Sequence, residues 1–250
     1  MGEVVVTGAA SGIGLATALR MARRGHHVWC LDRDGDRLAQ ALEAEPGLET
    51  EPLTVDVADE ASVERALATV ASRCDRLDGL VNSAGVIPVA PFAAHSVADW
   101  ELSYRVNVIG SYLAIRSALP MLRRSPEASI VNLASMAGKL AGPYTAAYNA
   151  SKAAVISLTR SAAVALAPGI RVNAVCPGVV MTPAYEKIDA RLQELDAPPI
   201  LRSTNRAATA PIGRPATADE IASVIEFLLG PGAAFVTGED INVSGGFVMH

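Results

Sequence analysis

The 250-residue chain has few cysteines, no long hydrophobic run and no excess of basic residues, and each absence excludes a class of protein. Cys30, Cys74 and Cys176 are too few and too far apart for a disulfide framework or a zinc site, which favours a reducing, cytoplasmic location. The four histidines form no metal-binding cluster in the sequence, so we expect no bound metal. A net charge of −5 gives no excess of positive charge that would attract nucleic acid or an anionic membrane surface.

The apolar segments are short and are interrupted by Gly, Arg, Asp or Asn, so none reaches the length of a membrane span. The first residues enter a strand-like run without the charged start, long apolar segment and cleavage site of a signal peptide. A chain of this length can bury a substantial core as one α/β unit. We therefore expect a single domain over residues 1–250.

Short β-branched runs alternate along the chain with longer segments that carry apolar residues at helical spacing. The predicted strands are residues 4–7, 27–31, 51–55, 79–82, 129–133, 171–176 and 240–243. The predicted helices are residues 12–24, 34–43, 60–72, 99–123, 148–167 and 218–229. Such alternation predicts an α/β fold, namely a Rossmann-like, doubly wound parallel sheet of about seven strands with helices on both faces.

Residues 182–215 fit this alternation poorly, because they are rich in proline and polar side chains and offer one modest helical stretch, 184–195. The segment directly follows a predicted strand, where doubly wound folds bind their ligands. A long irregular segment in a compact domain is more often a lid or binding loop than a linker. We expect it to be a mobile cover over a substrate site.

The first predicted strand runs into a glycine-rich turn, Gly8-Ala9-Ala10-Ser11-Gly12-Ile13-Gly14, that opens a helix. Glycines at such a turn let the backbone approach a pyrophosphate, whose charge is favoured at the helix N-terminus. The spacing differs from G-x-G-x-x-G, so a tight turn without a ligand remains the alternative.

Asp32 ends the second predicted strand, near the position from which a carboxylate accepts hydrogen bonds from an adenosine ribose. A carboxylate there would repel a 2′-phosphate, which favours NAD over NADP, although the adjacent Arg33 weakens that preference. A helix cap or turn residue is the alternative for Asp32 alone.

Tyr148 and Lys152 are four residues apart in a helical segment, so their side chains share one face. A phenol with a pKa near 10 is a poor base at neutral pH, and a neighbouring ammonium would lower that pKa. The chain has only three lysines among 21 basic residues, which hints that a compact ammonium is needed here. The alternative is that Tyr148 and Lys152 form an ordinary pair on the helix surface, with no catalytic role.

An ordered set of motifs resembles the short-chain dehydrogenase/reductase family from residue 4 to the C-terminus. The matching motifs are Thr7-Gly8-x-x-x-Gly12-x-Gly14, Asp56-Val57, Asn82-Ser83-Ala84-Gly85, Asn107, Ser135, Tyr148-x-x-x-Lys152, Pro177-Gly178 with Thr182, and Val243-Ser244-Gly245-Gly246. Ser83 stands where the family usually has Asn, and Ser244 where it usually has Asp. The resemblance implies hydride transfer between a nicotinamide dinucleotide and a carbonyl/alcohol pair.

By this resemblance, a set of residues along the carboxyl ends of the strands would bind the dinucleotide. They are Gly8, Ser11, Gly12, Ile13, Gly14, Asp32, Arg33, Asp56, Val57, Asn82, Ala84, Gly85, Tyr148, Lys152, Pro177, Gly178, Val180 and Thr182. Asp56 and Val57 would hold the adenine, and the residues from Pro177 to Thr182 the nicotinamide amide.

The same resemblance implies that Ser135 hydrogen-bonds the substrate oxygen and that Tyr148 exchanges its proton. Lys152 would hold the nicotinamide ribose and tune Tyr148. Asn107, within a predicted helix, would support a water that relays protons to solvent. The alternative is that Asn107 is a structural amide in the core or at an interface, with its hydrogen bonds satisfied there.

The substrate wall is expected to include Ser135, Met136, Tyr148 and Tyr185, together with Ala137, Lys139, Tyr144, Asn149, Val179 and parts of residues 182–215. Lys139 is the only charge expected in it. This mixed surface favours a polyol, a sugar or a hydroxy-ketone, and a hydroxy acid if Lys139 points inward. The stretch from Tyr148 to Lys152 is similar to that of polyol dehydrogenases.

Family members usually form tetramers through their two long helices and their C-terminal strand, so we expect a homotetramer. The apolar spacing along residues 106–119 is compatible with an isologous helix pair, and core packing explains part of it. Two rival functions remain open: an NADPH-dependent ketoacyl-type reductase, and a non-catalytic dinucleotide-binding regulator.

Overall fold

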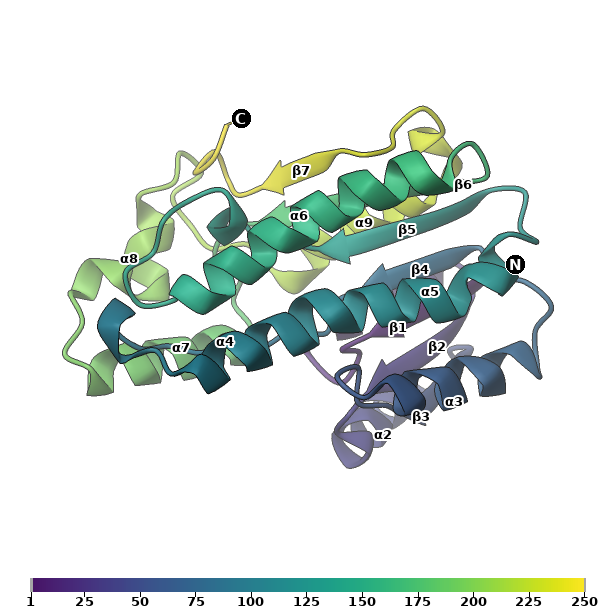
Figure 1. Ribbon diagram of the computed structural model, residues 1–250, viewed down its shortest axis with the longest axis horizontal. Coiled ribbons are helices and arrows are strands. Elements are labelled where there is room, and N and C mark those ends of the chain that lie inside the picture. Colours follow the sequence, from purple (N-terminus) through teal and green to yellow (C-terminus); the bar gives the residue numbers. More distant parts are fainter. Residues whose placement is uncertain (1, 250) are drawn as a thin grey trace.

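Seven parallel strands form one sheet in the order β3-β2-β1-β4-β5-β6-β7 in the computed structural model, which describes residues 2–249 (Figure 1). The two ends of the predicted domain, Met1 and His250, lie outside the described residues. The strands are β1 (Glu3–Thr7), β2 (His27–Asp32), β3 (Thr50–Thr54), β4 (Gly79–Asn82), β5 (Ala128–Leu133), β6 (Ile170–Pro177) and β7 (Asp240–Val243). The predicted doubly wound parallel sheet is confirmed.

Helices cover both faces of this sheet (Figure 1). They are α1 (Gly12–Arg23), α2 (Gly35–Glu43), α3 (Glu60–Ala71), α4 (Val97–Ser103), α5 (Gly110–Leu122), α6 (Ala146–Leu166), α7 (Pro183–Glu194), α8 (Ser203–Ala208) and α9 (Ala218–Leu229). The helices α3, α5 and α6 pack on one face, and α1, α2 and α9 pack on the other.

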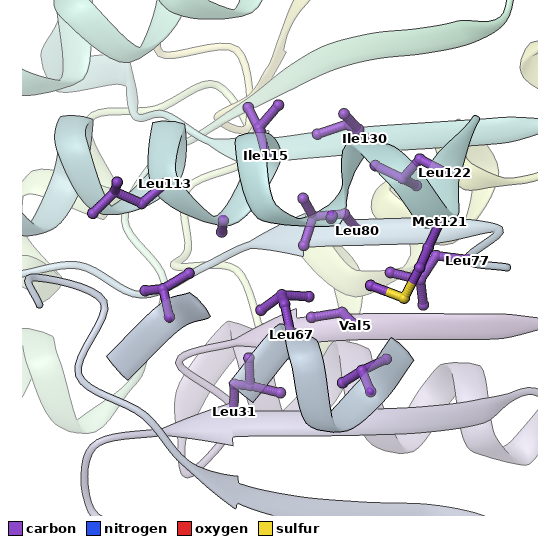
Figure 2. Close-up of a cluster of buried hydrophobic side chains, with 14 of the residues drawn as sticks. Val5, Leu31, Leu67, Leu77, Leu80, Leu113, Ile115, Met121, Leu122 and Ile130 are labelled. Atoms are coloured by element: carbon purple, nitrogen blue, oxygen red, sulfur yellow. The ribbon is translucent and has the colours of Figure 1, made fainter. Parts of the chain in front are cut away.

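Alternating strand residues build two hydrophobic cores, one on each face of the sheet. Val5 and Leu80 join the core under α3 and α5, together with Leu67 of α3 (Figure 2). Their neighbours Val4 and Val81 join the core under α1 and α9. Each fully buried side chain of this size contributes about 1.5–3 kcal/mol, so the sheet is a rigid platform for the loops at its edge.

The predicted long helix over residues 99–123 is helical throughout, but it is not a regular α-helix along its whole length. A π-helical turn, Tyr104–Ile109, separates α4 from α5. Turns of this kind arise where side-chain contacts displace the regular i→i−4 hydrogen bonds. Asn107 lies in this turn and bonds to residues outside it.

Residues 182–215 contain more helix than the sequence indicated. They form α7, a 3₁₀ turn (Pro199–Leu201) and α8. The base of the segment is fixed where Val180 pairs with Ala216 as a parallel bridge, and Met181 N–H donates to the Ala216 carbonyl at 3.0 Å. The segment therefore leaves and re-enters the fold at one point beside β6.

Within residues 2–249, none of the helices combines the length and the hydropathy needed to cross a membrane.

Candidate active site

The carboxyl ends of β1, β4, β5 and β6 border a cavity of about 630 Å³. It lies where β1 and β4 adjoin, the point at which the strand order reverses and at which open α/β sheets bind ligands. The predicted dinucleotide contacts that line it are Gly8, Ser11, Gly12, Ile13, Asp32, Arg33, Asp56, Val57, Ala84, Gly85, Tyr148, Lys152, Pro177, Gly178, Val180 and Thr182.

The glycine turn after β1 requires glycine for steric reasons. Gly8 and Gly12 have φ angles of +69° and +58°, which side chains disfavour. A Cβ on Gly14 would lie 2.1 Å from the Gly8 carbonyl oxygen, so α1 packs directly on the turn. Gly14 itself does not line the cavity. This open backbone at the start of α1 fits the phosphates of a dinucleotide.

Both oxygens of the Asp32 carboxylate accept backbone hydrogen bonds. One accepts from Ala10 N–H and the other from Asp34 N–H, each at 3.0 Å. The residue therefore supports the glycine turn and the turn after β2, while its side chain still lines the cavity. Arg33 and Arg37 line the cavity beside it.

Ser135, Tyr148 and Lys152 meet in the same cavity from two elements. Ser135 follows β5 and caps a short turn by accepting a hydrogen bond from Ala137 N–H at 3.1 Å. Tyr148 and Lys152 project from the first two turns of α6, and the Lys152 Nζ atom lies 5.7 Å from the centroid of the Tyr148 ring. The Lys152 ammonium donates to the carbonyl of Leu133, the last residue of β5.

Gly138 allows the Ser135 turn to lie against α6. A Cβ at this position would come within 2.8 Å of the Lys152 carbonyl carbon and 2.9 Å of the Ala153 nitrogen. The backbone contact therefore fixes Ser135 relative to the helix that carries Tyr148. Sequence reasoning did not identify Gly138, because only the fold brings this turn onto α6.

Burial controls the ionisation of both α6 side chains. It raises the pKa of the Tyr148 phenol above its usual value; Tyr185 adds to the rise, and a hydrogen bond with Ser135 opposes it. Burial also lowers the pKa of the Lys152 ammonium to about 8. Lys152 is not among the groups that shift the pKa of Tyr148 here, so its expected lowering of that pKa stays a prediction.

The Asn107 side chain is almost fully buried and does not line the cavity. Its Oδ1 accepts from Val86 N–H at 2.8 Å, and its Nδ2 donates to the Val86 carbonyl at 3.1 Å and to Ser151 Oγ at 2.8 Å. Ser151 in turn donates to the Tyr148 carbonyl at 2.7 Å. Asn107 thus ties the loop after β4 to α6, and its expected role toward a water stays a prediction.

Two further predicted site residues are buried beneath the cavity instead of lining it. Asn82 donates to Asn132 Oδ1 at 2.8 Å and joins β4 to β5. Met136 is 1% exposed and packs against Val179 and Ala207. A substrate contact by Met136 would require its side chain to leave this apolar cluster.

Several residues of the expected substrate wall do not line this cavity. Lys139 does not point into the cavity, because its Nζ pairs with the Asp240 carboxylate at 2.6 Å and donates to the Asp240 carbonyl at 2.9 Å. The other expected residues that do not line the cavity are Ala137, Tyr144, Asn149 and Val179. Tyr185 does line it, and its hydroxyl donates to the Gly178 carbonyl at 3.3 Å.

Residues that carry no family motif complete the wall. Ile87 and Val89 come from the loop after β4, and Lys187, Ile188 and Arg191 come from α7. The sequence predicts a helix over these three α7 residues. It does not predict that they face the cavity, because that depends on how α7 packs.

Of the residues that the structure describes, no three His, Cys, Asp or Glu side chains are grouped closely enough to hold a metal ion. The glycine turn lies at the reversal point of the parallel sheet, where such folds bind dinucleotides, and the Ser–Tyr–Lys cluster lies in the same cavity. A family model described as enoyl-(acyl carrier protein) reductase matches residues 8–248. The chain belongs to the short-chain dehydrogenase/reductase family.

Named relatives of the chain act on secondary alcohols or ketones. Cyclopentanol dehydrogenase of Comamonas sp. strain NCIMB 9872 is 36% identical over 252 residues, covering 99% of this chain and 97% of that protein. Cis-4-hydroxycyclohexanecarboxylate dehydrogenase of Sinomonas cyclohexanicum is 39% identical over 247 residues, covering 97% and 95%. The crystal structure of levodione reductase aligns with a TM-score of 0.89 at 31% identity, covering 98% and 96%.

Proposed function

We propose that the protein is an NAD(H)-dependent oxidoreductase that interconverts a secondary alcohol and a ketone, with Tyr148 as its acid–base group. The observation that carries this proposal is the meeting of Ser135, Tyr148 and Lys152 in the cavity that also contains the glycine turn. A bound nicotinamide dinucleotide would supply the hydride chemistry. The protein would supply position and electrostatics.

In this mechanism, the Ser135 hydroxyl orients the substrate oxygen toward the Tyr148 hydroxyl. During reduction, the neutral Tyr148 phenol donates its proton to the substrate oxygen. During oxidation, the phenolate removes the proton of the alcohol. Lys152 stabilises that phenolate as an ammonium and holds the nicotinamide ribose, and Asn107 keeps the Tyr148–Lys152 turn in place through Ser151.

The direct test is to follow NADH formation across cyclic alcohols, polyols, sugars and hydroxy acids. We expect oxidation of at least one class of secondary alcohol, and faster oxidation as the pH rises from 7 to 10, because the raised pKa of Tyr148 keeps the phenol protonated at neutral pH. Ketone reduction should show the opposite trend. No turnover by the wild-type protein, with NAD still bound, would favour a regulatory role instead.

Asp32 supports NAD over NADP, because its carboxylate lines the cavity and would repel a 2′-phosphate. An NADPH-dependent ketoacyl-type reductase is the second candidate. It is favoured by Arg33 and Arg37, which make no ion pair with any described residue and lie beside Asp32. We expect kcat/KM to be at least about tenfold higher with NADH than with NADPH, and an Asp32→Ser variant to narrow this ratio while Asp34→Ser does not.

A cyclic or aliphatic alcohol suits the cavity better than the polyol or sugar expected from the sequence. Ile87, Val89 and Ile188 line the cavity, and Lys139 contributes no charge to it. The names of cyclopentanol dehydrogenase and cis-4-hydroxycyclohexanecarboxylate dehydrogenase support a cyclic alcohol. Residues 182–215 would act as the cover of this substrate side.

We also propose a homotetramer in the cytoplasm. Two separate surfaces expose large apolar side chains, as an isologous interface requires. On α4 and α5, Leu102 and Tyr112 are 45% and 47% exposed. Near β7, Val164 of α6 and Phe235 are 83% and 105% exposed.

A further inference from the structure

One face of α7 forms part of the cavity wall and carries only positive charge. Ala184, Lys187, Ile188 and Arg191 line the cavity at intervals of three and four residues, as one helical face requires. The carboxylate of Asp189 on the same helix is turned to α8, where it accepts hydrogen bonds from Ser203 N–H and Oγ at 2.9 Å.

The position of these cations relative to the reacting end follows from Tyr185. This residue borders Tyr148, whose pKa it raises, and its hydroxyl bonds to the Gly178 carbonyl. Lys187 and Ile188 follow Tyr185 by two and three residues on α7, and Arg191 lies about 9 Å along the helix axis from Tyr185. This stretch of the cavity wall thus combines a hydroxyl group, an apolar side chain and two cations.

Lys187 has a free charge for a ligand. It forms no ion pair with any residue between 2 and 249, whereas the Arg191 guanidinium pairs with Glu194 at 2.7 Å. Lys139, the cation expected in the wall, is neutralised by Asp240. Of the three lysines, Lys152 belongs to the Ser135–Tyr148 cluster, Lys139 pairs with Asp240, and Lys187 lines the cavity without an ion pair to any described residue.

We infer that Lys187, assisted by Arg191, binds an anionic group of the substrate. The substrate class is then a secondary alcohol or ketone whose far end carries a carboxylate or a similar acid, separated from the hydroxyl by an apolar body. This inference rests on the proposed function and specifies its substrate. The hydroxyl lies at Ser135 and Tyr148, the apolar body contacts Ile87, Val89 and Ile188, and the acid reaches α7.

The test compares two substrates of similar shape, 4-hydroxycyclohexanecarboxylate and the neutral 4-methylcyclohexanol. For the wild-type enzyme we expect a higher kcat/KM for the acid. Lys187→Gln should reduce the acid-to-neutral ratio at least about tenfold, the usual effect of losing a charge-assisted hydrogen bond, mainly through KM. Lys187→Arg should retain the ratio.

Arg123→Gln is the matched control, because it removes one exposed positive charge at the C-terminal end of α5, at the opposite edge of the sheet. It should leave the ratio unchanged. NADH affinity, measured by fluorescence titration, should be the same for the wild type and Lys187→Gln. An unchanged ratio in Lys187→Gln overturns the inference, and so does an equal loss of NADH affinity, which would identify the bound anion as a dinucleotide phosphate.

Binding of cyclohexanecarboxylate to the NADH-saturated protein separates this inference from the proposed function. If no alcohol of the panel described above is oxidised, the proposed function fails. Calorimetric binding of cyclohexanecarboxylate that is lost in Lys187→Gln and kept in Lys187→Arg would still support the anion site, and binding that is absent or independent of Lys187 would refute it.

Discussion

Tyr148 and Lys152 are one helical turn apart, yet their ionisation follows from their environment more than from their spacing. Desolvation disfavours the charged form of each group, so it raises one pKa and lowers the other. Both side chains are therefore predominantly neutral near pH 9. The phenolate–ammonium form of the pair needs additional stabilisation, which the charges of a bound dinucleotide would supply. A buried pair of this kind costs stability, which is consistent with the acid–base role that we propose for it.

Lys152 provides a stability test of this burial. Its pKa is about 8 in the folded protein and near 10.4 in an unfolded chain. Between these values the unfolded chain binds more protons, so the free energy of unfolding rises with pH, and below pH 8 the folded protein carries the full cost of the buried charge. Lys152→Met should thus stabilise the protein at pH 7 by on the order of 2–3 kcal/mol, a gain that shrinks toward pH 10.5.

Urea unfolding at pH 7 and pH 10 measures this difference. Lys187→Met is the control, because Lys187 is exposed, and its effect should be near zero at both pH values. A Lys152→Met variant that is less stable than the wild type at pH 7 would show that the hydrogen bond to Leu133 outweighs the desolvation of the ammonium.

At the scale of the element, the strands were predictable, and the π-helical turn between α4 and α5 was not. Each predicted strand matches the structure to within two residues, because β-branched runs bounded by turn residues are a local signal. In the π-helical turn at Tyr104–Ile109, Asn107 bonds to Val86 and Ser151, which lie 21 and 44 residues away. Spacing within one helix carries no information about such contacts.

The contact between the Ser135 turn and α6 can be tested at Gly138. A methyl group there would meet α6 backbone, which cannot yield as a side chain can. Gly138→Ala should lower kcat by about tenfold or more, by displacing Ser135 from Tyr148, with a smaller effect on NADH affinity.

Gly169→Ala is the matched control, because its Cβ would have only the Leu166 carbonyl oxygen within 4 Å, at 3.9 Å. Wild-type kcat in Gly138→Ala would mean that the turn shifts without cost to the reaction.

For the whole molecule, the family motifs predicted most of the cavity residues that we propose bind the dinucleotide. The residues proposed to contact the substrate were harder to predict. Motif residues follow strand ends, so the sheet places them together in any protein of this topology. Lys139 and Met136 also follow a strand end, but Asp240 and an apolar cluster hold their side chains elsewhere. Ile87, Lys187 and Arg191 reach the cavity through tertiary packing of a loop and of α7.

The proposed assembly makes a prediction at this scale. Tyr112→Glu on α5 and Phe235→Glu near β7 each place a charge in one of the two exposed apolar surfaces. Either variant alone should convert the tetramer to dimers, and the double variant should be monomeric, as measured by light scattering after size exclusion. A monomeric wild-type protein, or a tetramer unaffected by both changes, would contradict the assignment of these surfaces.

The most direct measurement is the rate of alcohol oxidation by a Tyr148→Phe variant together with its NADH affinity. Removal of the hydroxyl should lower kcat by about two to four orders of magnitude, because the substrate proton then has no acceptor, while the NADH dissociation constant stays within a few-fold of the wild-type value. A variant that retains kcat within tenfold of the wild type would show that Tyr148 is not the acid–base group.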